Sequence, residues 1–317
     1  MAITKCVQTE ENLIRMAKAA FPDKCLLQSE ELTEGMCNAA YRLTFADGFK
    51  TILKISSPIK EGFMTNECNL MAAEVKAMRL AAEKTDIKVP AVYVYDTTRT
   101  ICAGDYFFME CLEGASWSSV AGSLSEAENL ALCEQTGRVQ KKLTALHNSC
   151  FGLLGDEEHT FDELYGLIRY LIGNVLNDAQ RRDVFIGVET ETILAALEQD
   201  KALFDAIQTP TLVHWDMWEG NIFVKDGSIS GIIDWERAMW GEPVMDDRFR
   251  RHTRRPAFLH GFGKEELSAE ELRRSSWYDI LLFLTMMTEG TYREYEDDGL
   301  YRWAKTQFEE AWQEIHA

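Results

Sequence analysis

The stretch from residue 213 to 236 holds polar side chains of the types that bind metal ions and act on phosphate groups. They are His214, Asp216, Asn221 and Asp234. Within this stretch the dipeptide Asp226-Gly227 is typical of a two-residue turn, and the apolar runs on its two sides predict a β-hairpin. The hairpin brings Asn221 and Asp234 to the same end, so that one cation could contact both side chains.

The turn also predicts which residues of the two strands face each other, and it places Asn221 opposite Ile232. Asp234 then lies two residues beyond this partner, on the same face of the hairpin and about 7 Å along the strand. Asp216 follows the apolar strand 211–213 in a short loop, from which it can reach the same end as a third oxygen ligand or as a base. Oxygen ligands of this kind suit Mg²⁺, which completes its shell with water and substrate phosphates.

A lysine that we expect to be buried lies in the first third of the chain. Residues 51–55 predict a strand that is apolar on both faces, and Lys54 lies within it. A buried ammonium group needs an anionic partner or it loses its charge. The next segment has apolar residues at helical spacing and carries Glu74 on that helix, whereas Glu67 lies near the helix start and is less suited. We therefore expect an ion pair between Lys54 and Glu74.

The spacing H-x-D-x-x-x-x-N at His214, Asp216 and Asn221, followed by Ile-Ile-Asp-Trp-Glu at 232–236, resembles the kinase-like phosphotransferases of the aminoglycoside phosphotransferase and choline kinase superfamily. The resemblance implies that Asp216 orients a substrate hydroxyl and accepts its proton. It also implies that Asn221 and Asp234 hold Mg²⁺ and that His214 supports the catalytic loop.

The same resemblance implies a nucleoside triphosphate, ATP or GTP, as the phosphoryl donor. The pair Lys54–Glu74 would grip its α and β phosphates. The loop 32–41 would cover the phosphates, although it has one glycine where protein kinases have three, and the backbone amides of Cys37 and Asn38 would approach them. The base pocket would be formed by Met109, with the backbone groups of Glu110 and Cys111 bonding adenine.

Strand patterns dominate the first 110 residues, and helical patterns dominate the segments 125–206, 269–293 and 301–315. This asymmetry predicts an α+β fold of the bilobal protein-kinase type, with a small antiparallel-sheet N-lobe and a larger, mainly helical C-lobe. We place the nucleotide-binding lobe at residues 1–110 and the catalytic and substrate-binding lobe at residues 111–317. A chain of 317 residues is long enough for two lobes that share a cleft.

Charge and composition narrow the classes of partner. The net charge of −19 argues against nucleic acid and anionic membranes as partners and is compatible with a cationic substrate. Neither a signal peptide nor a membrane span is indicated, so we expect a cytoplasmic protein. The eight cysteines have no C-x-x-C pair and are expected to be reduced thiols rather than zinc ligands or a disulfide framework. The sequence does not indicate the oligomeric state.

A small-molecule hydroxyl acceptor is favoured over a protein acceptor. Trp215 stands where regulated protein kinases usually have an arginine, and no Ala-Pro-Glu triplet follows Asp234. Carboxylates that could bind the ammonium groups of an aminoglycoside-type acceptor are Glu236, Asp246 and Glu289. Four tryptophans at 215–240 also leave a choline-type metabolite kinase open, because tryptophan faces attract quaternary ammonium groups. They are Trp215, Trp218, Trp235 and Trp240. Homoserine, macrolides, thioribose and other hydroxyl acceptors remain open as well.

Two functions from other classes were weighed. A nucleotide-binding pseudokinase scaffold is disfavoured because the lysine, the glutamate and the three residues of the metal loop are all present. A metal-dependent hydrolase would need more histidines than the six in the chain. The arginines between Arg248 and Arg255 form a local basic cluster, for which either an anion or partner site or a solvated, acid-paired segment is expected.

Overall fold

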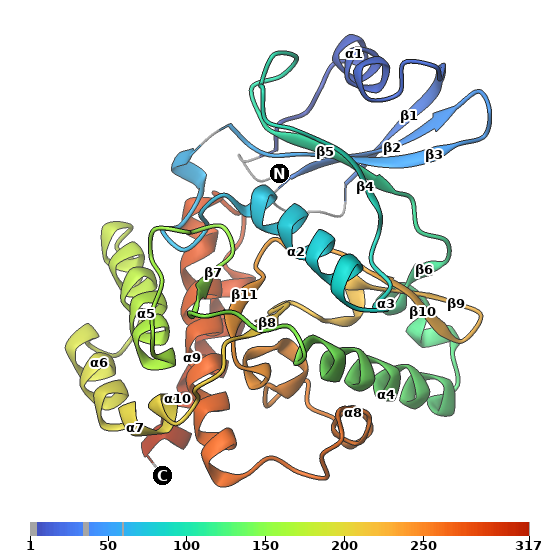
Figure 1. The fold of residues 1–317 in the computed structure, drawn as a ribbon. Helices are drawn as coiled ribbons and strands as arrows, with labels where there is room; N and C mark the ends of the chain where they lie inside the picture. Colours follow the sequence, from blue (N-terminus) through green and yellow to red (C-terminus); the bar gives the residue numbers. More distant parts are fainter. Residues whose placement is uncertain (1–4, 34–37, 59, 317) are drawn as a thin grey trace.

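Alternating apolar and polar side chains in the first third of the chain build an antiparallel sheet of five strands. The computed structural model describes residues 5–33, 38–58 and 60–316. The strands lie in the order β1-β2-β3-β5-β4, so β3, which carries Lys54, is the central strand (Figure 1). Their bounds are β1 Leu26–Leu32, β2 Ala39–Phe45, β3 Lys50–Ile55, β4 Val92–Asp96 and β5 Tyr106–Glu110.

One helix covers each face of this sheet, because successive side chains of a strand point to opposite faces. Tyr106 and Phe108 of β5 belong to a small core that they share with α1 (Glu10–Ala20). Phe107 and Met109 belong to the main core, which also contains the buried face of α2 (Leu70–Lys84). Figure 1 shows α2 between the sheet and the rest of the molecule, so this helix lies at the junction of the two lobes.

Helices build most of the chain beyond Glu110. The short helix α3 spans Trp117–Val120, and the longer ones are α4 Glu126–Leu143, α5 Leu164–Arg181, α6 Thr190–Gln199, α7 Lys201–Asp205, α8 Pro256–Phe262, α9 Ala269–Tyr292 and α10 Gly299–His316. The predicted helical segments are therefore confirmed. The 24-residue helix α9 runs through the larger lobe and packs against α10 and α5 (Figure 1).

Two small sheets in the larger lobe position residues 213–236, which contain the predicted metal ligands Asn221 and Asp234. One has the order β10-β9-β6, with β6 Ala115–Ser116, β9 Ile222–Lys225 and β10 Ser228–Ile232. The other has the order β7-β11-β8, with β7 Gly152–Leu153, β8 Thr211–Val213 and β11 Met239–Gly241. The α+β fold with an antiparallel sheet and a mainly helical remainder is confirmed. Residue 110 is where β5 ends, and the division into two domains at this point stays a prediction.

The predicted hairpin is present, but the strand pairing beyond the turn is shifted by one residue from the predicted pairing. Asp226 and Gly227 both have positive φ, at 49° and 74°, as the tight turn requires. Val224 pairs with Ile229 and Phe223 pairs with Gly231, so Ser230 is an extra residue that forms a bulge. Ile233, not Ile232, therefore lies opposite Asn221 and donates its N–H to the Asn221 carbonyl at 3.0 Å.

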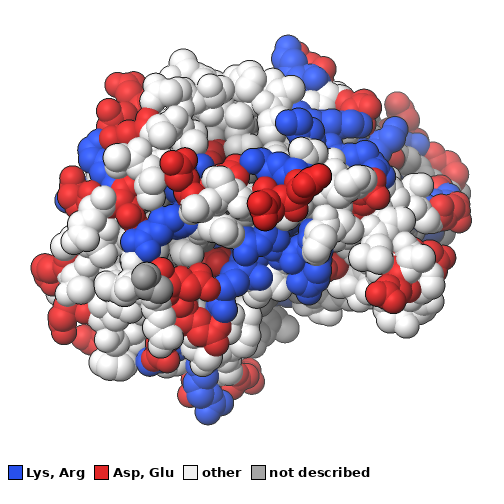
Figure 2. All heavy atoms as spheres, turned by 90° about the horizontal axis from the view of Figure 1, so that it is seen from below, with Lys and Arg blue, Asp and Glu red and all other residues white. Residues whose placement is uncertain are grey.

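Within the described part of the chain, no helix combines the length and the apolar character that crossing a bilayer requires. The seven cysteines that the structure describes are all free thiols. Basic and acidic side chains alternate in several clusters on the face of the molecule that Figure 2 presents.

Candidate phosphoryl-transfer site

Lys54 of the smaller lobe forms ion pairs with carboxylates from two separate elements, α2 and the segment after β10. Its Nζ lies 2.7 Å from a carboxylate oxygen of Glu74 on α2 and 2.6 Å from one of Asp234, which follows β10. A third carboxylate, that of Glu236, lies 3.5 Å away. The Lys54 side chain is 13% exposed and that of Glu74 only 1%, so this pair is shielded from water, whereas the Asp234 side chain is 35% exposed. The predicted pair between Lys54 and Glu74 is present.

Burial and charge act against each other in this cluster. Burial disfavours the ammonium form of Lys54, but the adjacent carboxylates of Asp234 and Glu74 outweigh it and raise the pKa of Lys54 well above its usual range. Burial likewise opposes ionisation of Asp234, yet the ammonium group beside it brings the pKa of Asp234 below its ordinary value. The Lys54–Asp234 contact is thus a charged pair.

The loop after β8 presents Asp216 in a fixed orientation. The side-chain amide of Asn221 donates to the Asp216 carboxylate at 3.1 Å and to its backbone carbonyl at 2.8 Å. Burial, together with the nearby negative charge of Asp234, raises the pKa of Asp216 to about 7. A carboxylate with this pKa can take a proton near neutral pH.

His214 supports this loop from within the core. Its ring Nε2 lies 3.0 Å from the carbonyl oxygen of Ile233, and its Nδ1 accepts the N–H of Asp216 at 3.3 Å. The ring is fully buried, and burial lowers the pKa of His214. The ring therefore joins the loop of Asp216 to the residue that follows β10, as a residue that supports this loop should.

The oxygen ligands at this end of the hairpin fit a magnesium ion. The carboxylate oxygens of Glu74, Asp234 and Glu236 all lie within 4.8 Å of one another, and the buried Oε1 of Glu74 has no hydrogen-bond partner among the described residues. Because the amide nitrogen of Asn221 bonds to Asp216, its side-chain oxygen is left to act as a ligand. An excess of carboxylates over ammonium groups favours a divalent cation here.

The residues predicted to contact the nucleotide differ in whether the structure leaves them free to do so. Cys37 lies outside the described residues. Asn38 is buried, and its side-chain amide donates to Glu236 at 2.7 Å. Met109 is buried in the main core at the end of β5, and its contact with a base stays a prediction. The backbone N–H of Glu110 already donates to the carbonyl of Ala91 at 2.9 Å, so this N–H is not available to adenine.

The three carboxylates predicted to contact the acceptor all have partners within the protein, and their contact with an acceptor stays a prediction. Glu236 lies between Lys54, at 3.5 Å, and the side-chain amide of Asn38, at 2.7 Å. Asp246 is fully buried and accepts the backbone N–H groups of His214 and Trp215, each at 3.1 Å. Glu289 is 5% exposed and pairs with arginines. These carboxylates are used within the protein because burial requires each of them to have a partner.

The basic cluster at 248–255 is acid-paired, as one of the two alternatives expected, but Arg248 and Arg250 are buried and not solvated. Arg248 is buried and donates to Glu219 at 2.7 Å. The guanidinium group of Arg250 lies 4.2 Å from the ring centroid of Trp215 and donates to its carbonyl oxygen. Trp215 itself has φ of 76°, a conformation that costs energy for a large side chain. Arg250 therefore packs against Trp215 and stabilises the loop that carries Asp216.

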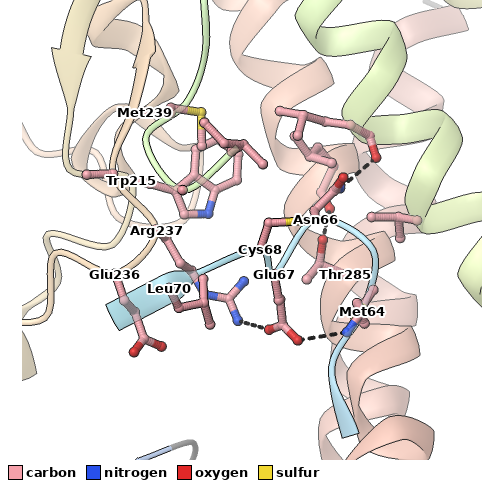
Figure 3. A pocket seen from close by; sticks show the side chains of 16 residues that line it. Met64, Asn66, Glu67, Cys68, Leu70, Trp215, Glu236, Arg237, Met239 and Thr285 are labelled. Carbon is pink, nitrogen blue, oxygen red and sulfur yellow. Dashed lines mark hydrogen bonds and ion pairs between the residues drawn. The ribbon is translucent and has the colours of Figure 1, made fainter. Parts of the chain in front are cut away.

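Two charged residues beside the site were not assigned from the sequence. Arg237 follows Asp234 by three positions, and its guanidinium group lies 3.0 Å from a carboxylate oxygen of Glu67. Both side chains line a crevice of about 50 Å³ whose walls include Trp215 and Met239 (Figure 3). No spacing rule links positions 67 and 237, so only the fold could reveal the contact.

Comparisons with known proteins agree with this geometry. A sequence model described as the phosphotransferase enzyme family matches residues 29–247. No match was found among the curated proteins whose sequences were compared. Among solved structures, a thermostable mutant of the aminoglycoside phosphotransferase APH(4)-Ia, in ternary complex with ADP and hygromycin B, has a TM-score of 0.68 at 15% identity, over 95% of this chain and 98% of that one.

Two further solved structures share the fold. A putative aminoglycoside phosphotransferase from Ralstonia eutropha JMP134 has a TM-score of 0.63 at 15% identity and covers 97% of this chain and 98% of its own. The ternary complex of streptomycin and ATP with APH(2")-IIa has a TM-score of 0.61 at 14% identity, over 98% of this chain and 97% of that one. At these identities the structures establish the kinase-like fold of the chain.

Proposed function

The chain belongs to the phosphotransferase enzyme family, and from this premise we propose that it moves the γ-phosphoryl group of ATP or GTP to a hydroxyl group of a small molecule. The observation that carries the proposal is the position of Lys54, which contacts Glu74 and Asp234 at 2.7 and 2.6 Å. A strand lysine paired with a helix glutamate is the arrangement with which kinases hold the α and β phosphates.

Asp216 is the residue that we assign to the acceptor. Its carboxylate accepts a hydrogen bond from Asn221, which fixes the direction in which it meets a hydroxyl group. Its pKa of about 7 lets it take the hydroxyl proton as the new oxygen–phosphorus bond forms. Positioning and neutralisation of charge supply most of the acceleration in such a transfer, and no covalent enzyme intermediate is needed.

Asn221 and Asp234 are the residues that we assign to Mg²⁺. When bound, Mg²⁺ neutralises negative charge on the phosphate oxygens. Lys54 then has two tasks, because it binds phosphate and also keeps Asp234 ionised. Glu236 contacts both Lys54 and the Asn38 side chain, and we assign it to the positioning of these two residues toward the phosphates.

Aminoglycoside-type antibiotics are the first acceptors to test, and choline-type or homoserine-type metabolites are the second. The solved relatives with bound acceptors contain hygromycin B or streptomycin. The net charge of −19 is compatible with a cationic acceptor. The burial of Asp246 and Glu289, however, removes two of the carboxylates on which the sequence argument for a polycation depended.

A substrate panel tests the proposed function directly. The purified protein is incubated with Mg²⁺ and ATP or GTP, and with aminoglycosides, macrolides, choline, homoserine or sugars in turn. We expect slow hydrolysis of the triphosphate alone and strong acceleration with one acceptor, with phosphate found on that acceptor by mass spectrometry. A chain that binds nucleotide but transfers phosphate to no member of the panel would instead be the pseudokinase scaffold.

Two substitutions assign the roles within the site. Asp216→Asn should abolish transfer while leaving nucleotide binding largely intact, because the carboxylate meets the acceptor and not the nucleotide. Asp234→Asn should lose both Mg²⁺ binding and transfer. Wild-type transfer by Asp216→Asn would show that the assigned proton acceptor is wrong.

A further inference from the structure

We propose that Glu67 and Arg237 are a positioning pair, which holds the helix that carries Glu74 in register with the loop that carries Asp234. This inference rests on the proposed phosphoryl transfer. Neither residue is assigned to the nucleotide, the metal ion or the proton transfer. Their role would be to keep two parts of the site, contributed by different lobes, at the separation that Lys54 requires.

The pair itself is close and shielded. The Arg237 guanidinium group donates to the Glu67 carboxylate at 3.0 Å, and the Glu67 side chain is 4% exposed and that of Arg237 23% exposed. The other oxygen of Glu67 accepts the backbone N–H of Met64, also at 3.0 Å. Figure 3 shows the Glu67 carboxylate between these two partners, at the edge of the crevice. A carboxylate held on both oxygens cannot easily move to another partner.

A second carboxylate, that of Glu289, and a second guanidinium group, that of Arg293, link the pair to α9. Arg293, which follows α9, lies 2.5 Å from the same Glu67 oxygen. Glu289 of α9 contacts Arg293 at 3.1 Å and Arg237 at 3.5 Å. The four charges alternate in sign, so each buried charge has two neighbours of the opposite sign. Networks of this kind fix geometry more strongly than a single surface pair does.

The segment before α2 is also bonded to the larger lobe at neighbouring positions. The Thr65 hydroxyl and backbone N–H both donate to Asp178 of α5 at 2.7 Å. The Asn66 side chain donates to the carbonyl of Leu171, and that of Asn69 to the carbonyl of Gly155, each at 2.9 Å. The start of α2 is therefore fixed on the larger lobe, although the helix packs beneath the sheet of the smaller one.

The need for such a link follows from the contacts of Lys54. One ammonium group contacts carboxylates from two separate elements, α2 and the loop after β10. Both contacts persist only if those elements keep a fixed separation. Glu67 precedes α2 by three residues and Arg237 follows Asp234 by three, so their ion pair joins the same two elements directly. Misplacement of about 1 Å in a catalytic group can cost about 100-fold in rate.

The test uses the full-length protein with its best acceptor and compares Glu67→Gln, Arg237→Met, Arg237→Lys and the double variant E67Q/R237M. We expect kcat to fall about 10- to 100-fold in E67Q and in R237M, with a much smaller change in KM for ATP. R237K should recover most of kcat because it keeps the charge. The loss of kcat in the double variant should be smaller than the product of the two single losses, since the two residues share one contact.

The matched control is Lys76→Gln. Lys76 lies on the same helix and forms an ion pair with Glu157 of the larger lobe at 2.7 Å, but both side chains are exposed. This variant should keep wild-type kcat, because exposed pairs contribute little. A measurement independent of activity is amide hydrogen exchange, which should become faster at the start of α2 in E67Q and stay unchanged in K76Q.

A purely structural role would give a different result. In that case E67Q would melt at a lower temperature, but kcat measured well below its melting temperature would stay within twofold of wild type, and the proposal would be overturned. Should E67Q fail to fold, the comparison of R237M with R237K decides in the same way, because equal kcat in both would overturn the proposal. Absence of transfer in the wild-type protein would count against the proposed function and not against the pair.

Discussion

The Nζ of Lys54 lies 2.6 Å from a carboxylate oxygen of Asp234, which follows it by 180 residues. The lysine comes from the central strand of the smaller lobe and the aspartate from the segment that follows β10 in the larger one. Their contact therefore joins the two lobes at the site that we propose for the phosphates of a nucleotide.

Replacement of Lys54 by methionine should lower the rate of transfer about 100- to 1000-fold, the usual effect of removing one donor that stabilises developing charge. Nucleotide affinity should fall as well, because the phosphates lose a cation. Kinetics with varied ATP and calorimetric titration with the nucleotide measure the two effects. Lys50→Met is the matched control, since Lys50 lies on the same strand but is exposed. Equal rates in the two variants would contradict the assignment of Lys54.

Asp216 should make the protein less stable as the pH rises. The pKa of this carboxyl is raised to about 7 in the folded protein, mainly by burial and by Asp234. Between about pH 4, where an unfolded aspartate titrates, and pH 7, the folded state holds a proton that the unfolded state has lost. Stability therefore falls with rising pH across this window. Asp216→Asn removes the titration, so it should melt at a higher temperature than wild type at pH 8 and at nearly the same temperature at pH 4.

Scanning calorimetry in the absence of nucleotide and Mg²⁺ checks this prediction. Glu113→Gln serves as a control, because Glu113 is an exposed carboxyl outside the site. It should show no gain at pH 8. A D216N variant whose difference from wild type is the same at both pH values would show that the carboxyl is not held protonated by the fold.

Residue spacing was sufficient to predict the core of the site. The apolar strand around Lys54 implied burial, burial implied an anionic partner, and Glu74 is that partner. The hairpin turn could also be predicted, because Asp226-Gly227 is one of the few dipeptides that accept positive φ at both positions. The bulge at Ser230 could not be predicted, since a bulge depends on how the strand packs and has no fixed sequence signal.

The carboxylates assigned to the acceptor show what a sequence cannot supply. Asp246 and Glu289 were expected to bind ammonium groups of an acceptor, although Asp246 follows Val244-Met245 and Glu289 lies at the end of an apolar run. In the fold one accepts backbone N–H groups and the other pairs with two arginines. The same limit applies to Glu67 and Arg237, whose contact joins positions 170 residues apart. Local patterns predict burial of apolar side chains well, but they do not predict which distant charge a buried acid will meet.

Asp246 should contribute strongly to stability through the catalytic loop. Its Oδ2 accepts the backbone N–H groups of His214 and Trp215, and its side chain is fully buried. Asp246→Ala leaves two buried donors without a partner, and each costs about 1–3 kcal/mol. We expect the free energy of unfolding in urea to fall by about 2–6 kcal/mol. Asp246→Asn keeps one oxygen that can accept both N–H groups and should lose clearly less. Similar losses in both variants would mean that the carboxylate charge, and not the two hydrogen bonds, supplies the stability.

Arg250 should stabilise the protein more at high pH than at low pH. Its side chain is 1% exposed and packs against the Trp215 ring, and its charge lowers the pKa of two buried carboxyls, Asp247 and Asp279, whose burial raises it. The net pKa of Asp279 is about 6, so its carboxyl is mostly neutral at pH 5 and ionised at pH 8. Arg250→Met removes one of the two arginines whose charge lowers the pKa of Asp279, and at pH 8 the ionised Asp279 keeps only Arg251, so the loss should approach the value of about 3–5 kcal/mol for a broken buried ion pair.

At pH 5 the loss caused by Arg250→Met should be smaller, because protonated carboxyls need no counter-charge and only the contacts with Trp215 are lost. Urea unfolding of R250M and wild type at pH 5 and pH 8 measures the difference. The exposed Arg255 provides the control, since R255M should change stability little and equally at both pH values. If R250M loses the same free energy at both pH values, the arginine stabilises the loop by packing on Trp215 alone, and its charge does not balance the aspartates beneath the catalytic loop.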